Sequence, residues 1–219
     1  MGNHEIINFD VQVFDNDFDS TVFDITKTNS GVVETQRMKV NVLGAYQAKN
    51  VATVLQTIEV LKKLPFFKKF DEPWWSVATK LGFEHLKFHT QFMGRWQIIN
   101  QNPVVLCDSA HNEGGLSLAM VQLKALTFNK LHVVVGMVKD KDISKMLSLF
   151  PADATYYFCK ANIPRGMDAE ELKEKAKDFG LIGKAYPSVK RALAAAKKSA
   201  KADDLIYVGG STFIVAEAL

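Results

Sequence analysis

Three side chains that could act on a phosphorylated ligand flank one short stretch of the chain. Arg95 precedes this stretch, and Asp108 and His111 follow it. A guanidinium can hold a phosphate through two parallel hydrogen bonds, and an aspartate that ends a strand can accept hydrogen bonds from ribose hydroxyls or lie near a metal-bound phosphate. The structural alternatives are an ion pair between Arg95 and Asp108, and a packing or helix-start role for His111. Residue type alone leaves both interpretations open.

A second candidate is the segment Gly209-Gly210-Ser211-Thr212, which lies between an apolar run and a short helical pattern. Glycines let a ligand approach the backbone closely, the N–H groups of a helix start attract an anion, and Ser211 or Thr212 adds a hydroxyl. A carboxylate or a phosphate would suit such a site. The structural alternative is an ordinary helix N-cap whose glycines serve only the turn.

The third candidate is the charged loop Lys139-Asp140-Lys141-Asp142, which follows another apolar run. Its mixed charge could steer an anionic substrate. A solvated loop in which Asp142 caps the next helix explains the pattern equally well. Arg165, which follows the next apolar run along the chain, allows the same two interpretations.

The elements that must position these residues alternate from residue 94 onward. Apolar runs at 96–99 and 104–107 flank turn residues and predict a hairpin. Five strand-then-helix units follow, with strands at 104–107, 130–135, 154–159, 183–186 and 205–208. This alternation predicts an α/β domain with a mostly parallel sheet and flanking helices. Ligands of such sheets bind at the carboxyl ends of the strands, so we expect the candidate residues to gather there.

The first part of the chain has a different pattern. Short runs rich in Val, Phe and Thr predict a small antiparallel meander with strands at 7–14, 20–28, 32–34 and 38–42. One helix is expected to begin near Asn50, and a second is expected over 74–81, ending at Gly82. The change of pattern places a boundary near residues 83–94, and we expect domains at 1–85 and 86–219.

Composition narrows the class of protein. The 219 residues are 47% hydrophobic, and 27 basic against 24 acidic residues give a net charge of +3 that does not indicate nucleic-acid binding. Cys107 and Cys159 lie inside apolar runs and are expected to be reduced core thiols. No zinc-ligand spacing, membrane-length apolar run or signal peptide is present, so we expect a cytoplasmic protein with no metal site of its own and no membrane partner. The Ala- and Lys-rich stretch 192–201 predicts a helix with a solvated face.

Two nucleotide-binding motifs are missing. The chain contains no G-x-x-x-x-G-K-[ST], and no G-x-G-x-x-G follows a predicted strand. The segment most similar to the first motif, 180–185, has too few residues between its glycines and lacks the Ser or Thr after the lysine. A nicotinamide dehydrogenase is therefore disfavoured, and the chain should not hydrolyse a nucleotide alone because it would need a phosphate cradle from elsewhere.

Five blocks of sequence carry a resemblance to a known family: G-A-Y-Q-A-K-N (44–50), G-R-W (94–96), D-S-A-H-N (108–112), G-M-V-K-D-K-D (136–142) and the closing segment 203–219. Together, and in this order, they resemble the folylpolyglutamate synthase and dihydrofolate synthase family of the Mur ligase group. The blocks cover most of 41–219, and D-x-A-H-N with an upstream G-R is the most specific of them.

The resemblance implies a two-domain ligase in which a P-loop ATPase domain precedes a Rossmann-like domain. Residues 1–85 would then be the tail of the ATPase domain, and 86–219 the ligase domain. The P-loop and the family's magnesium ligands are absent from this stretch, so we expect a piece of a longer enzyme, inactive by itself. ATP and Mg²⁺ would be the cofactors, the missing ATPase domain would be the partner, and the enzyme would be a monomer.

The implied reaction belongs to folate biosynthesis and one-carbon metabolism. ATP would activate a folate or dihydropteroate carboxylate as an acyl phosphate, and the amine of L-glutamate would then attack it. By resemblance, Asn50 lies near the adenine, Arg95 on the phosphates, Asp108 near the ribose or phosphate, and His111 beside the nucleotide. The resemblance thus favours the functional interpretation of Arg95 and Asp108. By their position at the sheet edge, Ser211, Lys139, Lys141 and Asp142 are expected to bind glutamate.

The sequence leaves two alternatives open. A cell-wall Mur ligase would add an amino acid to a nucleotide-linked peptide, but D-S-A-H-N and the D-K-D loop argue against it. A stand-alone nucleotide- or amino-acid-binding module would keep the fold without catalysis. Stable ATP binding by the 219-residue chain alone would favour the module.

Overall fold

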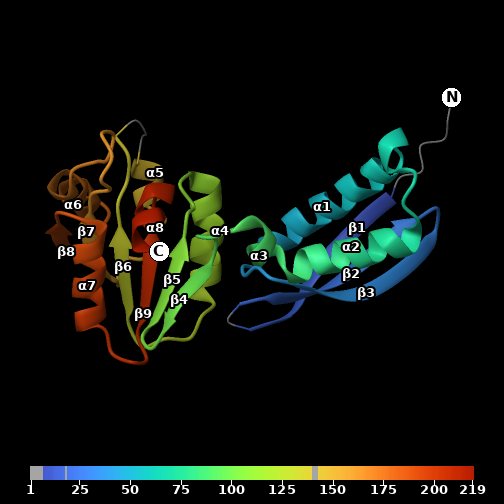
Figure 1. Cartoon of the computed structure of the whole chain (residues 1–219). Helices are drawn as coiled ribbons and strands as arrows, with labels where there is room; N and C mark the ends of the chain where they lie inside the picture. The colour runs from blue at the N-terminus through green and yellow to red at the C-terminus, as the bar shows by residue number, and fades with distance from the viewer. Residues whose placement is uncertain (1–6, 18, 140–142) are drawn as a thin grey trace. The chain divides into compact units, whose positions relative to one another are not determined.

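The computed structural model describes residues 7–17, 19–139 and 143–219. The chain divides into two compact units, Met1–Met93 and Gly94–Leu219 (Figure 1). This boundary lies C-terminal to the expected 85/86 because helix α3 (Leu86–Thr90) belongs to the first unit, where Leu86 packs against the core.

The first unit contains an antiparallel sheet in the order β1-β2-β3, which confirms the predicted meander. Its strands are β1 (Ile7–Asn16), β2 (Thr21–Asn29) and β3 (Val32–Val40). The sequence predicted two short runs where β3 is one strand. Polar residues such as Gln36 interrupt the apolar pattern, but β2 pairs with the backbone along the whole length of β3, from Val32 to Val40.

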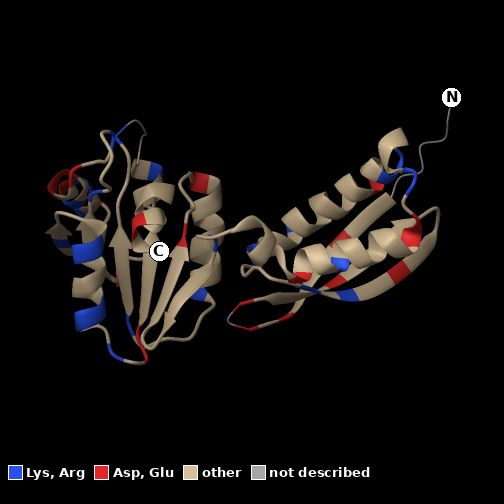
Figure 2. Cartoon of the chain, viewed as in Figure 1, with Lys and Arg blue, Asp and Glu red and all other residues tan. Residues whose placement is uncertain are grey.

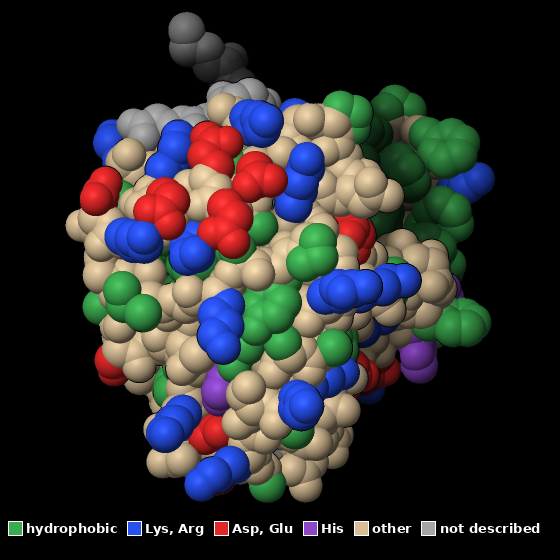
Figure 3. Space-filling view, turned by 90° about the vertical axis from the view of Figure 1, so that its left-hand side faces the viewer, with side chains coloured by type: hydrophobic (Ala, Val, Ile, Leu, Met, Phe, Trp, Pro, Cys, Tyr) green, Lys and Arg blue, Asp and Glu red, His purple; other side chains and the backbone are tan. Residues whose placement is uncertain are grey.

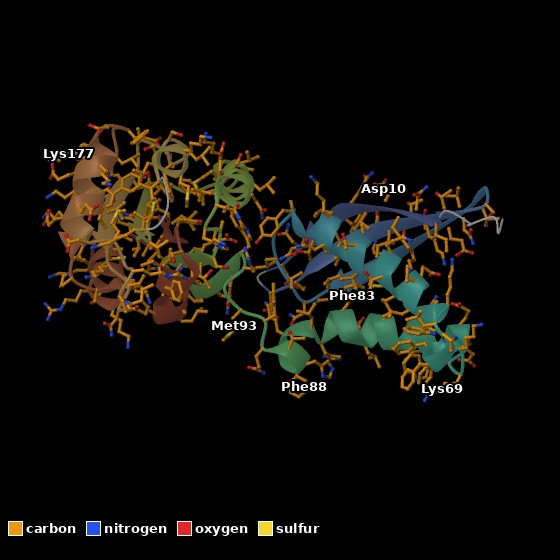
Figure 4. All side chains as sticks on the ribbon, turned by 90° about the horizontal axis from the view of Figure 1, so that it is seen from above. Asp10, Lys69, Phe83, Phe88, Met93 and Lys177 are labelled. Atoms are coloured by element: carbon orange, nitrogen blue, oxygen red, sulfur yellow. The ribbon has the colours of Figure 1, made fainter. Side chains whose placement is uncertain are left out.

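Three helical segments precede α3: α1 (Gln47–Lys62), the 3₁₀ turn η1 (Pro65–Phe67) and α2 (Glu72–Glu84). Phe23 and Ile25 of the sheet form one core with Val51 of α1 and Phe83 of α2. Phe83 is 6% exposed, whereas Phe88 of α3 is 77% exposed; both are labelled in Figure 4. Helix α2 begins earlier than predicted because the Asp71 carboxylate caps it, accepting a hydrogen bond from the Trp74 N–H at 2.9 Å.

The second unit is built on a six-stranded sheet in the order β4-β5-β9-β6-β7-β8. Its strands are β4 (Gln97–Gln101), β5 (Val104–Asp108), β6 (Leu131–Val135), β7 (Thr155–Cys159), β8 (Gly183–Tyr186) and β9 (Leu205–Gly209). The hairpin partner β4 is antiparallel to β5, and the other pairings are parallel. The predicted α/β class with a mostly parallel sheet is confirmed.

Each parallel strand leads into a helix, as the alternation predicted. The helices are α4 (Glu113–Lys124), α5 (Ser144–Leu147), α6 (Ala169–Lys177), α7 (Val189–Ser199) and α8 (Thr212–Ala218). The path runs in one direction across the sheet from β5 to β8 and then returns to β9. Right-handed crossovers therefore put α4, α5 and α6 on one face and α7 on the other (Figure 1). Apolar residues of α7 and α8 share a core with Cys107 and Cys159, which form no disulfide.

Burial of both thiols raises the pKa of Cys107 and of Cys159 to about 12, as expected for unreactive core cysteines. Lysines lie along the outer side of α7 (Figure 2). On the face shown in Figure 3, basic side chains are interspersed with acidic ones. Lys173 and Lys177 of α6, for example, form ion pairs with neighbouring glutamates. The solvated lysine helix predicted for 192–201 corresponds to the second half of α7.

Candidate functional site at the carboxyl edge of the parallel sheet

The carboxyl ends of the central strands meet at one edge of the sheet. Asp108, the last residue of β5, pairs with Gly209 of β9, and Gly209 pairs with Val135 of β6. The segments that follow these three strands carry His111, Ser211 and Lys139. This edge therefore brings together candidates that are far apart in the sequence, as expected from the parallel arrangement.

Arg95 is presented by a strained turn. Gly94 and Trp96, on either side of it, have φ values of +75° and +48°. A Cβ at Gly94 would lie 2.8 Å from Cγ1 of Val215, so glycine is required there both for its conformation and for space. The Gly94 N–H donates to Oε1 of Gln97 at 2.7 Å, and the Gly94 carbonyl accepts a hydrogen bond from the Ser109 N–H at 2.8 Å. The first bond ties the turn to the start of β4, and the second attaches it to the residue after β5.

The Asp108 carboxylate completes this attachment. It is 1% exposed, and its Oδ2 accepts a hydrogen bond from the Trp96 N–H at 2.9 Å, while Oδ1 accepts one from the Ala110 N–H at 2.8 Å. Across 7–17, 19–139 and 143–219, no side chain forms a hydrogen bond or an ion pair with the Arg95 guanidinium, including that of Asp108. The carboxylate therefore accepts hydrogen bonds from the backbone of Trp96, which follows Arg95, and of Ala110, which lies beyond the end of β5.

His111 lies just beyond β5 and is half-buried. Its Nδ1 is 3.1 Å from the carbonyl oxygen of Ser109. A carbonyl only accepts hydrogen bonds, so this contact places a proton on Nδ1 and makes Nε2 the acceptor in the neutral ring. His111 lines a cavity of about 320 Å³ together with Ser211 and Arg165.

Ser211 is buried at the start of α8. Its Oγ accepts a hydrogen bond from the Phe213 N–H at 3.3 Å, so the N-cap interpretation describes its hydrogen bonding, and the residue also lines the cavity. Gly210 beside it has φ +91°, and a Cβ there would lie 2.8 Å from the Gly136 carbonyl oxygen. This glycine allows the segments after β6 and β9 to touch.

The charged loop after β6 is described only in part. Lys141 and Asp142 lie outside the described residues, and Lys139 is exposed. The Lys139 N–H donates to the Arg165 carbonyl at 3.0 Å, which brings the segment after β7 into the site. Apolar side chains complete the cavity wall: Met137, Val138, Ile143, Met146 and Phe213. Sequence reasoning did not name these five as site residues, and their signal was proximity to the ends of predicted strands.

Asn50 lies in the first unit. It is exposed on the first turns of α1, where its Nδ2 donates to Oε1 of Gln47 at 2.6 Å. Within the described parts of the chain, no three His, Cys, Asp or Glu side chains are grouped so that they could hold a metal ion. In the same parts, no helix combines the length and the apolar character needed to cross a membrane.

Comparison with known proteins identifies the family of the domain that carries this site. The profile of the family described as "Mur ligase, glutamate ligase domain" matches residues 94–212, which cover the second unit from the Gly94 turn to Thr212 at the start of α8. The chain belongs to the Mur ligase family. Its glutamate ligase domain carries His111, Ser211 and the strained turn at Arg95.

Individual relatives of this Mur ligase chain are folate enzymes. A probable bifunctional folylpolyglutamate synthase/dihydropteroate synthase of Haloferax volcanii is 30% identical over 186 residues, 84% of this chain and 21% of that protein. The dihydrofolate synthase/folylpolyglutamate synthase of Escherichia coli K12 is 36% identical over 128 residues, 58% of this chain and 29% of the relative.

A solved structure extends the similarity to both units. The E. coli FolC structure in complex with DHPP and ADP matches 95% of this chain and 45% of that protein, with a TM-score of 0.69 and 27% identity. The Mur ligase chain thus spans less than half the length of the relatives it resembles. The predicted resemblance to the C-terminal portion of folylpolyglutamate synthases is confirmed.

Proposed function

We propose that the chain forms the C-terminal part of an ATP-dependent ligase that joins L-glutamate to a folate or dihydropteroate carboxylate through an acyl phosphate. The observation that carries the proposal is the match of 94–212 to the glutamate ligase domain. The similarity to folate enzymes of H. volcanii and E. coli supports folate over a cell-wall substrate. In this proposal, the first unit, Met1–Met93, belongs to the ATPase domain, and Mg²⁺ is held mainly by residues outside this chain.

The residues of the second unit fit a nucleotide phosphate. Arg95 projects from a turn fixed on both sides by hydrogen bonds to β5, and its guanidinium has no competing partner within the described residues. A fixed cation at a sheet edge is suited to the charge of a transferring phosphoryl group. ADP is bound in the E. coli structure that this chain resembles. Asn50 on α1 would contact the adenine.

ATP supplies the phosphoryl group that activates the carboxylate. In our proposal, Arg95 binds the phosphates, His111 lies beside the nucleotide, and Ser211 with the 139–142 loop binds the carboxylates of glutamate. Asp108 acts differently from the role that the resemblance implies. Its buried carboxylate holds the backbone of the Arg95 turn, so it positions Arg95 instead of contacting the ligand.

The test is a coupled assay on the complete gene product. With ATP and Mg²⁺ present, ADP should be released only when L-glutamate and either dihydropteroate or a reduced folate are both added. Comparing the two acceptors assigns the enzyme as a dihydrofolate synthase, a folylpolyglutamate synthase or both. Absence of glutamate-dependent ADP release with either acceptor would contradict the proposal.

A second measurement separates the ligase from a stand-alone binding module. Isothermal titration of the 219-residue chain with ATP should detect weak binding or none, since the phosphate cradle motif is missing from its sequence. Micromolar binding by this chain alone would favour the module. Reading the gene upstream of residue 1 for G-x-x-x-x-G-K-[ST] gives an independent answer.

A further inference from the structure

Large apolar side chains lie uncovered where α1 leads through η1 into α2. Phe66 is 69% exposed, Trp74 is 43% exposed, and Val77, one turn further along α2, is exposed as well. Together with the half-buried Phe70 they form what we call the aromatic patch. Single exposed apolar residues are common on protein surfaces, whereas a contiguous group of large ones marks a surface that binds another.

Contacts between neighbouring rings fix the patch in place. Phe70 is stacked on Trp74, with the ring centroids 4.0 Å apart, and Trp74 packs edge-on against the buried Trp75 at 5.2 Å. Nζ of Lys69, which is labelled in Figure 4, lies 4.8 Å from the ring centroid of Phe66 and 5.0 Å from that of Phe70. Rings held by the fold in this way form a ready-made binding surface, because little side-chain entropy is left to lose on binding.

The patch also carries cations that lack an acidic partner. Lys63, Lys68 and Lys69 are exposed, and none of them forms an ion pair with any residue that the structure describes. The nearby acids have other partners: Asp71 caps α2, and Oε2 of Glu72 lies 2.8 Å from Nζ of the last residue of α1. The surface is thus apolar and positively charged, so it is complementary to one that is apolar and acidic.

The first strand begins near the end of α1 from which the patch extends. Strand β1 starts at Ile7, and Asn8 and Phe9 line one cavity with Gln56 and Val60 of α1. Val60 belongs to the last turn of α1, which is followed directly by η1 (Figure 1). Polypeptide that precedes β1 therefore joins the first unit close to the aromatic patch.

We propose that the aromatic patch is the docking surface for the part of the ATPase domain that precedes β1 in the complete protein. This inference rests on the proposed function, which assigns the first unit to that domain, and deepens it by naming the contact and the chemistry of its occupant. This chain matches 45% of the E. coli structure, so a relative of that length has enough further polypeptide to cover the patch. The occupant is a segment that places apolar side chains on the rings and Asp or Glu beside Lys63, Lys68 and Lys69.

The first test is hydroxyl-radical footprinting, read by mass spectrometry, of the 219-residue chain and of the complete gene product. Phe88, which is 77% exposed on α3 and lies outside the patch, is the internal control. Relative to Phe88, the reactivity of Phe66 and Trp74 should be about fivefold or more lower in the complete protein, because the centre of an interface excludes water. An unchanged ratio in the two proteins would overturn the proposal.

The second test is carbodiimide cross-linking of the complete protein at low concentration, which identifies the occupant. This reagent joins a lysine Nζ directly to a carboxylate that touches it. We expect an amide bond within one chain, from Lys63, Lys68 or Lys69 to an acidic residue upstream of residue 1. Changing all three lysines to arginine keeps the charge and should abolish the product, because a guanidinium does not couple.

Other outcomes would overturn the proposal. Cross-links that join two chains would assign the patch to a second copy. Binding of the complete protein to vesicles of phosphatidylcholine and phosphatidylglycerol, lost in Phe66→Ser, would assign it to a membrane surface. Protection of the rings without any cross-link would contradict the acidic character of the occupant.

Neither readout depends on ligation, so the two proposals can fail separately. A complete protein that protects Phe66 and Trp74 but releases no ADP with glutamate contradicts the proposed function alone. One that ligates glutamate while both rings stay as reactive as in the 219-residue chain contradicts the docking surface alone.

Discussion

The Trp96 N–H donates to Oδ2 of Asp108 at 2.9 Å, and this bond fixes a residue with positive φ to the end of a buried strand. A non-glycine residue in that conformation is strained and persists only where its surroundings hold it. The bond thereby defines where Arg95, one residue earlier, leaves the turn. Arg95 and Asp108 are related through the backbone, not through an ion pair.

Asp108→Asn should destabilise the chain. The asparagine keeps one acceptor oxygen but turns an NH₂ group toward the Trp96 N–H or the Ala110 N–H, which leaves a buried donor without an acceptor. The expected loss is about 1–3 kcal/mol of unfolding free energy. Urea unfolding of the 219-residue chain measures it. Asp203→Asn, the same change at an exposed position, should stay within about 0.5 kcal/mol; equal effects of the two would refute the role of Asp108.

Arg95→Ala should affect activity and leave stability nearly unchanged, because the guanidinium has no partner among the described residues. In the complete ligase, we expect kcat/KM for ATP to fall about 100-fold or more, as on removal of a phosphate-binding cation. The unfolding midpoint of the chain should not move. If Arg95→Ala ligates at the wild-type rate, Arg95 does not bind the phosphates and its role is structural.

Ser211→Ala should raise the KM for glutamate, because the substitution removes a hydroxyl from the cavity that we assign to this substrate. It should also cost about 1 kcal/mol of stability through loss of the α8 cap. Ser188→Ala separates the two effects: Ser188 caps α7 by an equivalent 3.3 Å bond to the Arg191 N–H and lies outside the cavity lining. The two variants should lose similar stability, and only Ser211→Ala should change the glutamate KM.

A buried polar cluster at the opposite edge of the sheet predicts acid sensitivity. The Lys201 N–H, with further hydrogen bonds from His132 and Asn129, holds the pKa of Asp204 below its usual value. Because the pKa is lower in the folded chain than in the unfolded chain, Asp204 contributes stability above about pH 4. That contribution is lost as the pH falls through the lowered value.

Urea midpoints measured between pH 2.5 and 5.5 for the wild type and Asp204→Asn test this prediction. The variant lacks the titrating group, so the difference in midpoint between the two proteins should shrink as the pH falls below 4. A difference that is constant across this range would show that Asp204 does not contribute through its charge.

Local patterns in the sequence determined the elements of this protein. The alternation after residue 94 specified five strand-and-helix units, and the runs rich in Val, Phe and Thr before residue 43 specified the meander. These features follow from side-chain periodicity within single segments, which is a local property. The boundaries were less well determined, as with α2, because a cap such as Asp71 depends on one hydrogen bond and not on a repeated pattern.

Tertiary structure decided how those elements make a site. Insertion of β9 between β5 and β6 places Ser211 beside His111, and it depends on pairing between strands that are far apart in the chain. The same is true of Arg165, whose position is fixed by backbone bonds to the loop after β6. The sequence identified Asp108 as a charged residue at a strand end, but only the folded chain shows that its carboxylate is committed to backbone N–H groups. Contacts between residues far apart in the chain produce no repeating pattern in the sequence. Residue type therefore predicted which side chains are candidates for the site, and the fold decided what each of them contacts.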